Sequence, residues 1–111
     1  MKLRISGPAR RDIASARAWS DRTFGVEARD RYRDLISLAL ASIASGTTLA
    51  AMHRPQFGEG LHLYHLRHAR GDPATVRVPR HFLAYRINGD TAVILRLLRD
   101  AMDLPSQITD E

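Results

Sequence analysis

The side chains whose type and spacing suggest chemistry in this 111-residue sequence are histidines and arginines. Three of the five histidines, His62, His65 and His68, recur at intervals of three residues, and imidazole is a common zinc ligand. On a strand, residues three apart point to opposite faces, so only His62 and His68 could converge. Neither a cysteine nor a carboxylate joins them. We therefore expect surface or turn histidines, with no metal and no other cofactor.

Arginine supplies sixteen of the seventeen basic residues, and its guanidinium fork binds carboxylate as readily as phosphate. The net charge is +5, yet residues 100–111 carry four acidic groups and no basic one. A basic body with an acidic tail favours an acidic partner, which is either a nucleic acid or an acidic protein segment. Charge alone does not choose between these two classes.

Direct nucleic-acid binding would need basic residues that are free to meet phosphate. Arg29, Arg31 and Arg33 follow one another along a predicted helix, but Asp30 and Asp34 interleave with them. These carboxylates lower the local positive field, so a solvated helix face is the commoner explanation of the pattern.

Length and composition predict a single domain over residues 1–111, because there is no room for a second core. Without cysteine, hydrophobic packing must hold the fold together, which suits a reducing compartment. The N-terminus shows no signal peptide, and no apolar run approaches the roughly 20 residues of a membrane span. We expect a cytoplasmic protein with no membrane partner.

A short strand and two helices are predicted for the first half of the chain. Residues 3–5 alternate apolar and polar side chains, and Ser6 and Pro8 are typical of a helix cap and first turn. Two helical stripes follow, separated by a predicted three-residue break at 23–25 and ended by Gly46. Their members are Ala9, Ile13, Ala16 and Ser20 in the first helix, and Ala28, Tyr32, Leu35, Ala39 and Ile43 in the second. Such helices form an antiparallel hairpin that must cover another layer.

The second half of the chain predicts three strands. Residues 47–60 read as a loop or a short helical turn, and residues 61–66 read as a partly alternating strand. Two stronger strands, 80–87 and 91–98, flank Asn88-Gly89, the favoured pair of a type I′ turn. That turn would place Ile87 opposite Asp90.

This register predicts apolar residues on both faces of the sheet. One face would hold Phe82, Ala84, Val93, Leu95 and Leu97, and the other Leu83, Tyr85, Ile87, Ala92, Ile94 and Leu98. The helical hairpin can cover one face, and the other needs the C-terminal tail or a partner chain.

The order of elements and three local motifs resemble the ParE toxin family of the RelE/ParE superfamily. Residues 79–87, PRHFLAYRI, resemble its R-H-φ-φ-Y-R-φ strand, and residues 94–104, ILRLLRDAMDL, resemble its I-L-R-V-L-H-x-x-M-D-L ending. Residues 64–68, YHLRH, match a further family stretch, and Arg99 stands where ParE proteins usually carry His. The resemblance implies an α+β fold with an N-terminal strand, a helical hairpin and a three-stranded antiparallel sheet that completes a four-stranded sheet.

The resemblance also implies a function. ParE proteins are the toxins of type II toxin–antitoxin systems, which stabilise plasmids or chromosomes. They inhibit DNA gyrase through protein contact and not as enzymes, and a ParD-type antitoxin holds them inactive in a hetero-oligomer. We expect the chain to meet DNA only indirectly, through its antitoxin.

Two sets of contact residues follow from this resemblance. The expected gyrase-binding residues are Arg99, Met102, Asp103 and Leu104. The expected antitoxin-binding residues, on the helical hairpin and the sheet, are Trp19, Tyr32, Leu35, Arg80 and Tyr85.

An alternative is a RelE-like ribosome-dependent mRNA endonuclease, which needs arginines at the scissile phosphate and an aromatic residue that stacks a base. Arg67 fits the first arginine, but the second position falls near Ala101 or Met102, neither of which is basic. No aromatic residue follows Tyr85. We therefore rank the nuclease second, and expect Arg86 and Arg96 to pair with carboxylates or carbonyls that orient the sheet.

Overall fold

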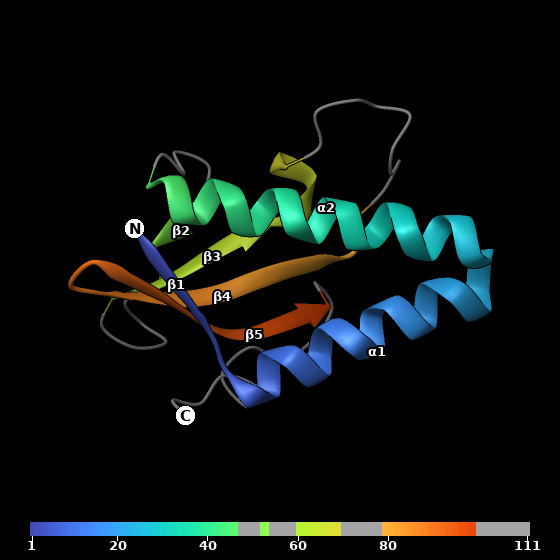
Figure 1. The fold of residues 1–111 in the computed structure, drawn as a ribbon, viewed down its shortest axis with the longest axis horizontal. Coiled ribbons are helices and arrows are strands. Elements are labelled where there is room, and N and C mark those ends of the chain that lie inside the picture. Colours follow the sequence, from blue (N-terminus) through green and yellow to red (C-terminus); the bar gives the residue numbers. More distant parts are fainter. Residues whose placement is uncertain (47–51, 54–59, 70–78, 100–111) are drawn as a thin grey trace.

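The computed structural model describes residues 1–46, 52–53, 60–69 and 79–99. Within them the chain forms five strands, two α-helices and one 3-10 helix (Figure 1). The elements in chain order are β1 (Lys2–Ile5), α1 (Gly7–Phe24), α2 (Val26–Ser45), β2 (Met52–His53), β3 (Leu61–His65), η2 (Leu66–His68), β4 (His81–Asn88) and β5 (Thr91–Arg99). The expected contact residues Met102, Asp103 and Leu104 lie outside the described residues.

All five strands belong to one mixed sheet in the order β1-β5-β4-β3-β2. The N-terminal strand β1 runs parallel to β5, and the other neighbours are antiparallel. This arrangement confirms the α+β, RelE/ParE-like fold. It also adds the edge strand β2 within residues 47–60, where we expected no strand. Two residues are too few to show a period, so only pairing with β3 reveals this strand.

The first helix begins at a cap that ties it to the sheet. The Ser6 hydroxyl accepts a hydrogen bond from the Ala9 N–H at 3.1 Å and donates one to the Leu95 carbonyl at 2.8 Å. The first contact satisfies a free helix N–H, and the second anchors the helix start to β5. Ser6 is buried, with Pro8 in the first turn, as the sequence predicted.

The two helices are joined by one residue and not by the three-residue break we expected. Thr23 and Phe24 remain helical, and Gly25 alone changes the chain direction with φ of 98°. Such a positive φ suits glycine, so a single residue is enough to end one helix and start the next. Figure 1 shows α1 and α2 meeting at this junction and spreading apart toward their other ends. The second helix ends at Gly46 as predicted.

The β4–β5 turn also differs by one residue from the expected position. Asn88 pairs with Thr91 and Ile87 with Ala92, so Gly89-Asp90 forms the loop. Gly89 has φ of 62°, whereas Asp90 does not have a positive φ. A type I′ turn needs positive φ at both central residues, and glycine at the first central position is the mark of type II′.

An irregularity in the same strand pair changes the predicted faces. Tyr85 pairs with Ile94 and Ala84 with Arg96, which leaves Leu95 as an extra residue on β5. Beyond a β-bulge the alternation of side chains moves by one residue. Leu97 therefore packs in the cluster under the helices and Leu98 in the opposite cluster, the reverse of our expectation.

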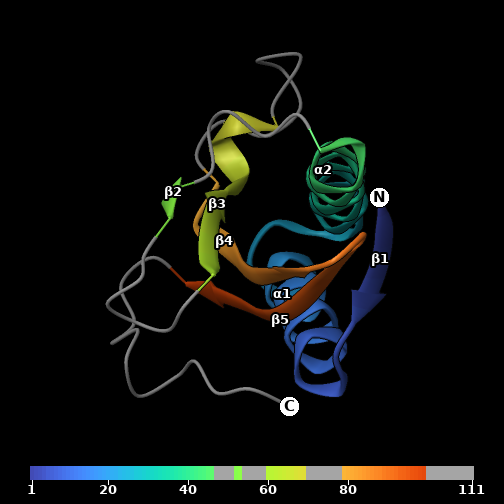
Figure 2. The same ribbon diagram turned by 90° about the vertical axis from the view of Figure 1, so that its left-hand side faces the viewer.

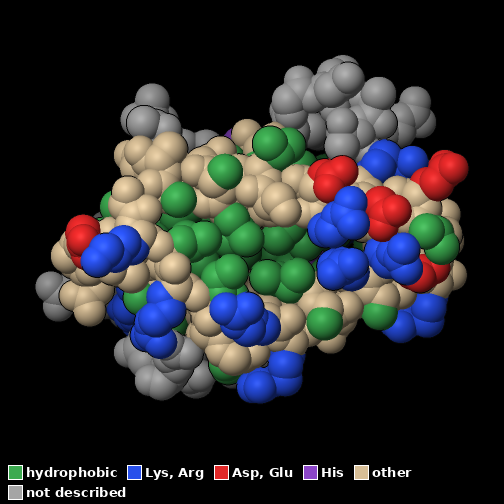
Figure 3. All heavy atoms as spheres, in the orientation of Figure 1, with side chains coloured by type: hydrophobic (Ala, Val, Ile, Leu, Met, Phe, Trp, Pro, Cys, Tyr) green, Lys and Arg blue, Asp and Glu red, His purple; other side chains and the backbone are tan. Residues whose placement is uncertain are grey.

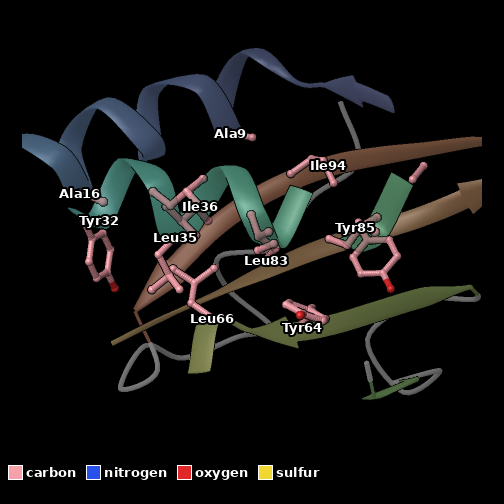
Figure 4. Close-up of a cluster of buried hydrophobic side chains, with 14 residues drawn as sticks. Ala9, Ala16, Tyr32, Leu35, Ile36, Tyr64, Leu66, Leu83, Tyr85 and Ile94 are labelled. Atoms are coloured by element: carbon pink, nitrogen blue, oxygen red, sulfur yellow. The ribbon is translucent and has the colours of Figure 1, made fainter. Parts of the chain in front are cut away.

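The core consists of two apolar clusters, one on each face of the sheet. The larger one joins both helices to the sheet (Figure 4) and contains Ala9, Ala16, Tyr32, Leu35, Ile36, Ala39, Ile43, Tyr64, Leu66, Leu83, Tyr85, Ala92, Ile94 and Leu97. The smaller one contains only strand residues, Leu61, Leu63, Phe82, Ala84, Val93, Leu95 and Leu98. Figure 2, turned by 90° from Figure 1, shows the strands following one another across the sheet from β1 to β2. The expectation of two apolar faces is confirmed.

Neither described helix is both long and apolar enough to cross a membrane.

Candidate functional site

Residues from three elements meet around Trp19 at one end of the sheet. Trp19 lies on α1, and the guanidinium carbon of Arg99, the last residue of β5, is 5.7 Å from its ring centroid. The Phe24 ring meets Trp19 edge to face at 5.8 Å, and the His81 ring does so at 6.1 Å. We define the tryptophan–arginine patch as Trp19, Phe24, Arg99 and Arg80, the residue just before His81. Figure 1 shows the end of β5 beside α1.

Hydrogen bonds from α2 fix the inner side of this patch. The Tyr32 hydroxyl is 2.6 Å from the His81 Nδ1 and accepts the Arg80 N–H at 3.1 Å. Tyr32 and His81 are both buried, and their rings also meet edge to face at 5.4 Å. The series Tyr32, His81, Trp19 therefore connects the core to the surface. Tyr32 supports the patch from inside.

The remaining expected antitoxin-binding residues lie in the core. Leu35 and Tyr85 are 0% and 1% exposed, so they cannot meet a partner while the fold is intact. His62 stacks on the Tyr85 ring at 5.3 Å with an interplanar angle of 19°. Leu35 and Tyr85 therefore belong to the core and not to a binding surface.

Sequence reasoning missed Phe24 and His81 as parts of the site. Phe24 fell in the expected helix break, yet it is the most exposed of the large apolar residues that the structure describes, at 67%. An exposed aromatic residue beside a glycine turn was the available signal. His81 was read only as part of a motif, because its hydrogen bond comes from a residue 49 positions away.

Arg96, three residues before Arg99, has a structural partner. Its Nε and Nη2 donate to the two Asp12 carboxylate oxygens at 2.6 and 3.0 Å. The Leu97 N–H donates to the same carboxylate at 3.0 Å, because β1 ends beside Ile94 and leaves this edge of β5 open. The hydrogen bond to Asp12 raises the pKa of Arg96, although burial opposes the shift. The expected structural role of Arg96 is confirmed.

The arginines of α2 are interleaved with acids, as the sequence indicated. Arg29 lies 3.3 Å from both Asp21 and Asp30, and Arg33 lies 3.3 Å from Asp34. Exposed pairs of this kind contribute about 0–1 kcal/mol each. The main effect of these acidic residues is to neutralise the positive electrostatic field that would attract a phosphate group.

A second apolar surface lies between the helices. Half-buried residues from β1, α1 and α2 pack here against the larger core cluster, namely Leu3, Ile5, Ile13 and Leu40. We call these four residues the interhelical strip. Figure 3 shows hydrophobic side chains gathered between α1 and α2 with basic side chains around them. Within the part of the chain that the structure describes, the buried Nε of Arg17 on α1 has no hydrogen-bond partner.

The third candidate surface is the turn after β3. The Arg67 N–H donates to the His65 Nδ1 at 3.1 Å, and the His68 ring lies 6.0 Å from that of Tyr64. Burial lowers the pKa of His68, and the charges of Arg67 and His65 lower it further. In the described part of the chain, no three histidine or acidic side chains are placed to hold a metal ion.

Comparison with protein families finds a match over most of the chain. The family described as "ParE toxin of type II toxin-antitoxin system, parDE" matches residues 3–104, nearly the whole chain. A comparison with curated proteins finds no similar sequence.

Proposed function

Because the chain belongs to the ParE toxin family of type II toxin–antitoxin systems, we propose that it inhibits DNA gyrase by protein contact and is neutralised by a ParD-type antitoxin. The observation that carries this proposal is the tryptophan–arginine patch. It presents exposed Arg99 and Phe24 at the root of the tail, on a base of buried side chains. Arginine and aromatic residues on rigid supports are typical of binding hot spots.

The tail residues Met102, Asp103 and Leu104 extend the proposed gyrase contact from Arg99. This part of the proposal rests on their position in the family motif. A contact surface made of one cation and a following apolar and acidic segment needs no bond-breaking chemistry.

The antitoxin is proposed to lie on the helical hairpin. The interhelical strip offers half-buried apolar side chains, and an amphipathic segment laid along it would bury them. Trp19 and Arg80 continue this surface toward the end of the sheet.

A second candidate function is the mRNA endonuclease, favoured only by the turn that groups Arg67 with His65 and His68. A nuclease needs a cation at the phosphate and a group that moves a proton. This turn supplies Arg67 as the cation and His68 as a histidine that is more often neutral. Catalysis by this turn would make Arg67 essential.

The test compares the two activities with purified protein. We expect the chain to inhibit supercoiling by DNA gyrase, and we expect prior addition of the antitoxin to restore supercoiling. In parallel, ribosomes carrying mRNA should show no cleavage, and Arg67→Gln should inhibit gyrase as the natural chain does. Cleavage of mRNA without inhibition of gyrase, abolished by Arg67→Gln, would reverse the ranking.

A further inference from the structure

The face of the sheet that is turned away from the helices carries the smaller apolar cluster. We call its seven buried residues the far-face cluster: Leu61, Leu63, Phe82, Ala84, Val93, Leu95 and Leu98. Val93 is the most exposed of them, at only 9%. Neither α1 nor α2 contributes a residue to this cluster, since both helices pack against the other face. A cover over the far face therefore has to come from a segment outside the described residues or from a second chain.

The chain itself leads from this face into residues 100–111, which we call the tail. Leu98 belongs to the far-face cluster, and the tail begins directly after Arg99, the last residue of β5. Twelve residues in an extended form span about 40 Å. The nine residues of β5 span about 30 Å. The tail is therefore long enough to run back along the whole of β5.

The apolar residues of the tail are spaced so that they can share one side. Leu104 follows Met102 by two residues, and Ile108 follows four residues later. In an extended chain, residues two or four positions apart point to the same side. Pro105 favours an extended Leu104, because proline disfavours helical dihedral angles in the residue before it. The three apolar side chains can thus face the sheet together, and Asp103 then faces away from it.

The spacing along the tail also matches the spacing along β5. From Met102 to Ile108 an extended chain advances six residues, or about 20 Å. From Leu98 back to Val93 the strand advances five residues, or about 17 Å. A tail that turns back with Met102 over Leu98 therefore brings Ile108 to Val93, at the other end of the far-face cluster.

Charge on the far face agrees with this direction. Arg4 on β1 and Arg86 on β4 are the two register partners of Val93. The neighbours of Arg4 within β1 pack under the helices, so Arg4 itself points to the far face. The last two residues of the tail, 110 and 111, are both acidic. A tail that runs back along β5 brings its acidic end to these two arginines.

We propose that the tail folds back as a strap over the far-face cluster, with Met102, Leu104 and Ile108 against the sheet. This inference deepens the proposed function, because it separates the tail residues that we expect at gyrase. Met102 and Leu104 position the tail, and Asp103 between them is presented to the partner. The inference rests on the proposed function only for this role of Asp103.

The test uses the absence of cysteine from the sequence, since two introduced cysteines then report on a single contact. The full chain with Val93→Cys and Ile108→Cys is oxidised, and the intramolecular disulfide is measured by mass spectrometry. The control pair is Ser37→Cys with Ile108→Cys, because Ser37 is exposed on α2. A disulfide needs Cα atoms within about 7 Å, so we expect the first pair to form it at least about tenfold faster.

Three results would overturn the inference. Equal rates for the two pairs would mean that the tail does not rest on the far face. No intramolecular disulfide in either pair would mean the same. Disulfide-linked dimers would assign the far face to a second copy of the chain.

A second measurement needs no crosslink. In Val93→Cys alone, the rate of reaction with a thiol reagent reports how often the far face opens. Adding Leu104→Gln should raise this rate at least about tenfold, because an apolar side chain is lost from the contact. Adding Arg11→Gln, which replaces an exposed arginine near the start of α1, should leave the rate within about twofold. A slow rate that Leu104→Gln does not change would mean that another segment covers the face, and the inference would be wrong.

The outcomes separate this inference from the proposed function. If the disulfide forms but gyrase is never inhibited, the strap stands and the proposed target is wrong. If gyrase is inhibited but the first pair forms no faster than the control pair, the function stands and the strap is wrong.

Discussion

Arg96 and Arg99 lie three residues apart on β5, but their surroundings differ. Arg96 is half-buried and makes a bidentate pair with Asp12, which also accepts the Leu97 N–H. Arg99 is exposed, lies over Trp19 and has no carboxylate partner in the described residues. The same residue type therefore joins a helix to the sheet at one position and offers free donors at the other. The surroundings of an arginine, more than its place in a motif, indicate what it does.

The largest expected loss of stability comes from replacing Arg96. Arg96→Gln leaves the Asp12 carboxylate partly buried with one N–H partner, so we expect a loss of about 2–4 kcal/mol in the free energy of unfolding. Urea unfolding followed by circular dichroism measures this loss. Asp12→Asn, which keeps one acceptor oxygen, should cost less. A loss below about 0.5 kcal/mol for Arg96→Gln would contradict the structural role.

Removing the hydroxyl of Tyr32 should have the next largest effect. Tyr32→Phe removes the hydroxyl that makes hydrogen bonds with the His81 Nδ1 and the Arg80 N–H, and it keeps the ring in the core. We expect a loss of about 1–2 kcal/mol in the free energy of unfolding. Trp19 emission should also change in the folded protein, because its support at His81 loosens. Unchanged emission would show that the patch does not depend on Tyr32.

The variant Arg99→Gln tests whether Arg99, unlike Arg96, is dispensable for the stability of the fold. Since Arg99 is exposed and unpaired within the described chain, we expect its replacement to change the free energy of unfolding by less than about 0.5 kcal/mol. The same urea experiment serves as the measurement. A loss as large as that of Arg96→Gln would mean that Arg99, too, is a structural residue.

The smallest expected effect concerns His68. Its pKa is lowered in the folded chain by burial and by Arg67 and His65, so the unfolded chain binds the proton more readily. The corresponding stability is present above the unfolded pKa of about 6.5 and is lost as the pH falls through the lower folded value. Between about pH 7.5 and pH 5.5, the natural chain should lose slightly more stability than His68→Gln. An equal loss of stability in the natural chain and in His68→Gln would contradict a lowered pKa of His68 in the folded chain.

The sequence predicted most of the fold because its periodic segments are long. The helical stripes, the Ser6 cap and the apolar β4–β5 pair all appear where their patterns indicated. The errors fall where one residue decides the geometry. Gly25 alone joins the helices, Gly89 opens the β4–β5 turn, and Leu95 is extra in β5. The period of apolar side chains is read over many residues, so a single glycine or one extra residue hardly changes it.

The candidate site was less accessible to sequence reasoning. Two motifs contain Arg80 and Arg99, and Trp19 was singled out on the first predicted helix, but the contact of Trp19 with Arg99 depends on β5 ending beside α1. Tyr85 and Leu35 were expected to bind the antitoxin because of the family resemblance, but packing between the helices and the sheet buries them. A pattern gives the face of an element. It does not say which faces meet water.

The proposed inhibition of gyrase depends most on contact between Arg99 and gyrase. The direct measurement is the concentration of protein that halves supercoiling by DNA gyrase, determined for Arg99→Gln and for the control Arg11→Gln at equal folded concentration. We predict that Arg99→Gln needs at least about tenfold more protein, whereas Arg11→Gln matches the natural chain. Equal inhibition by both variants would contradict the account.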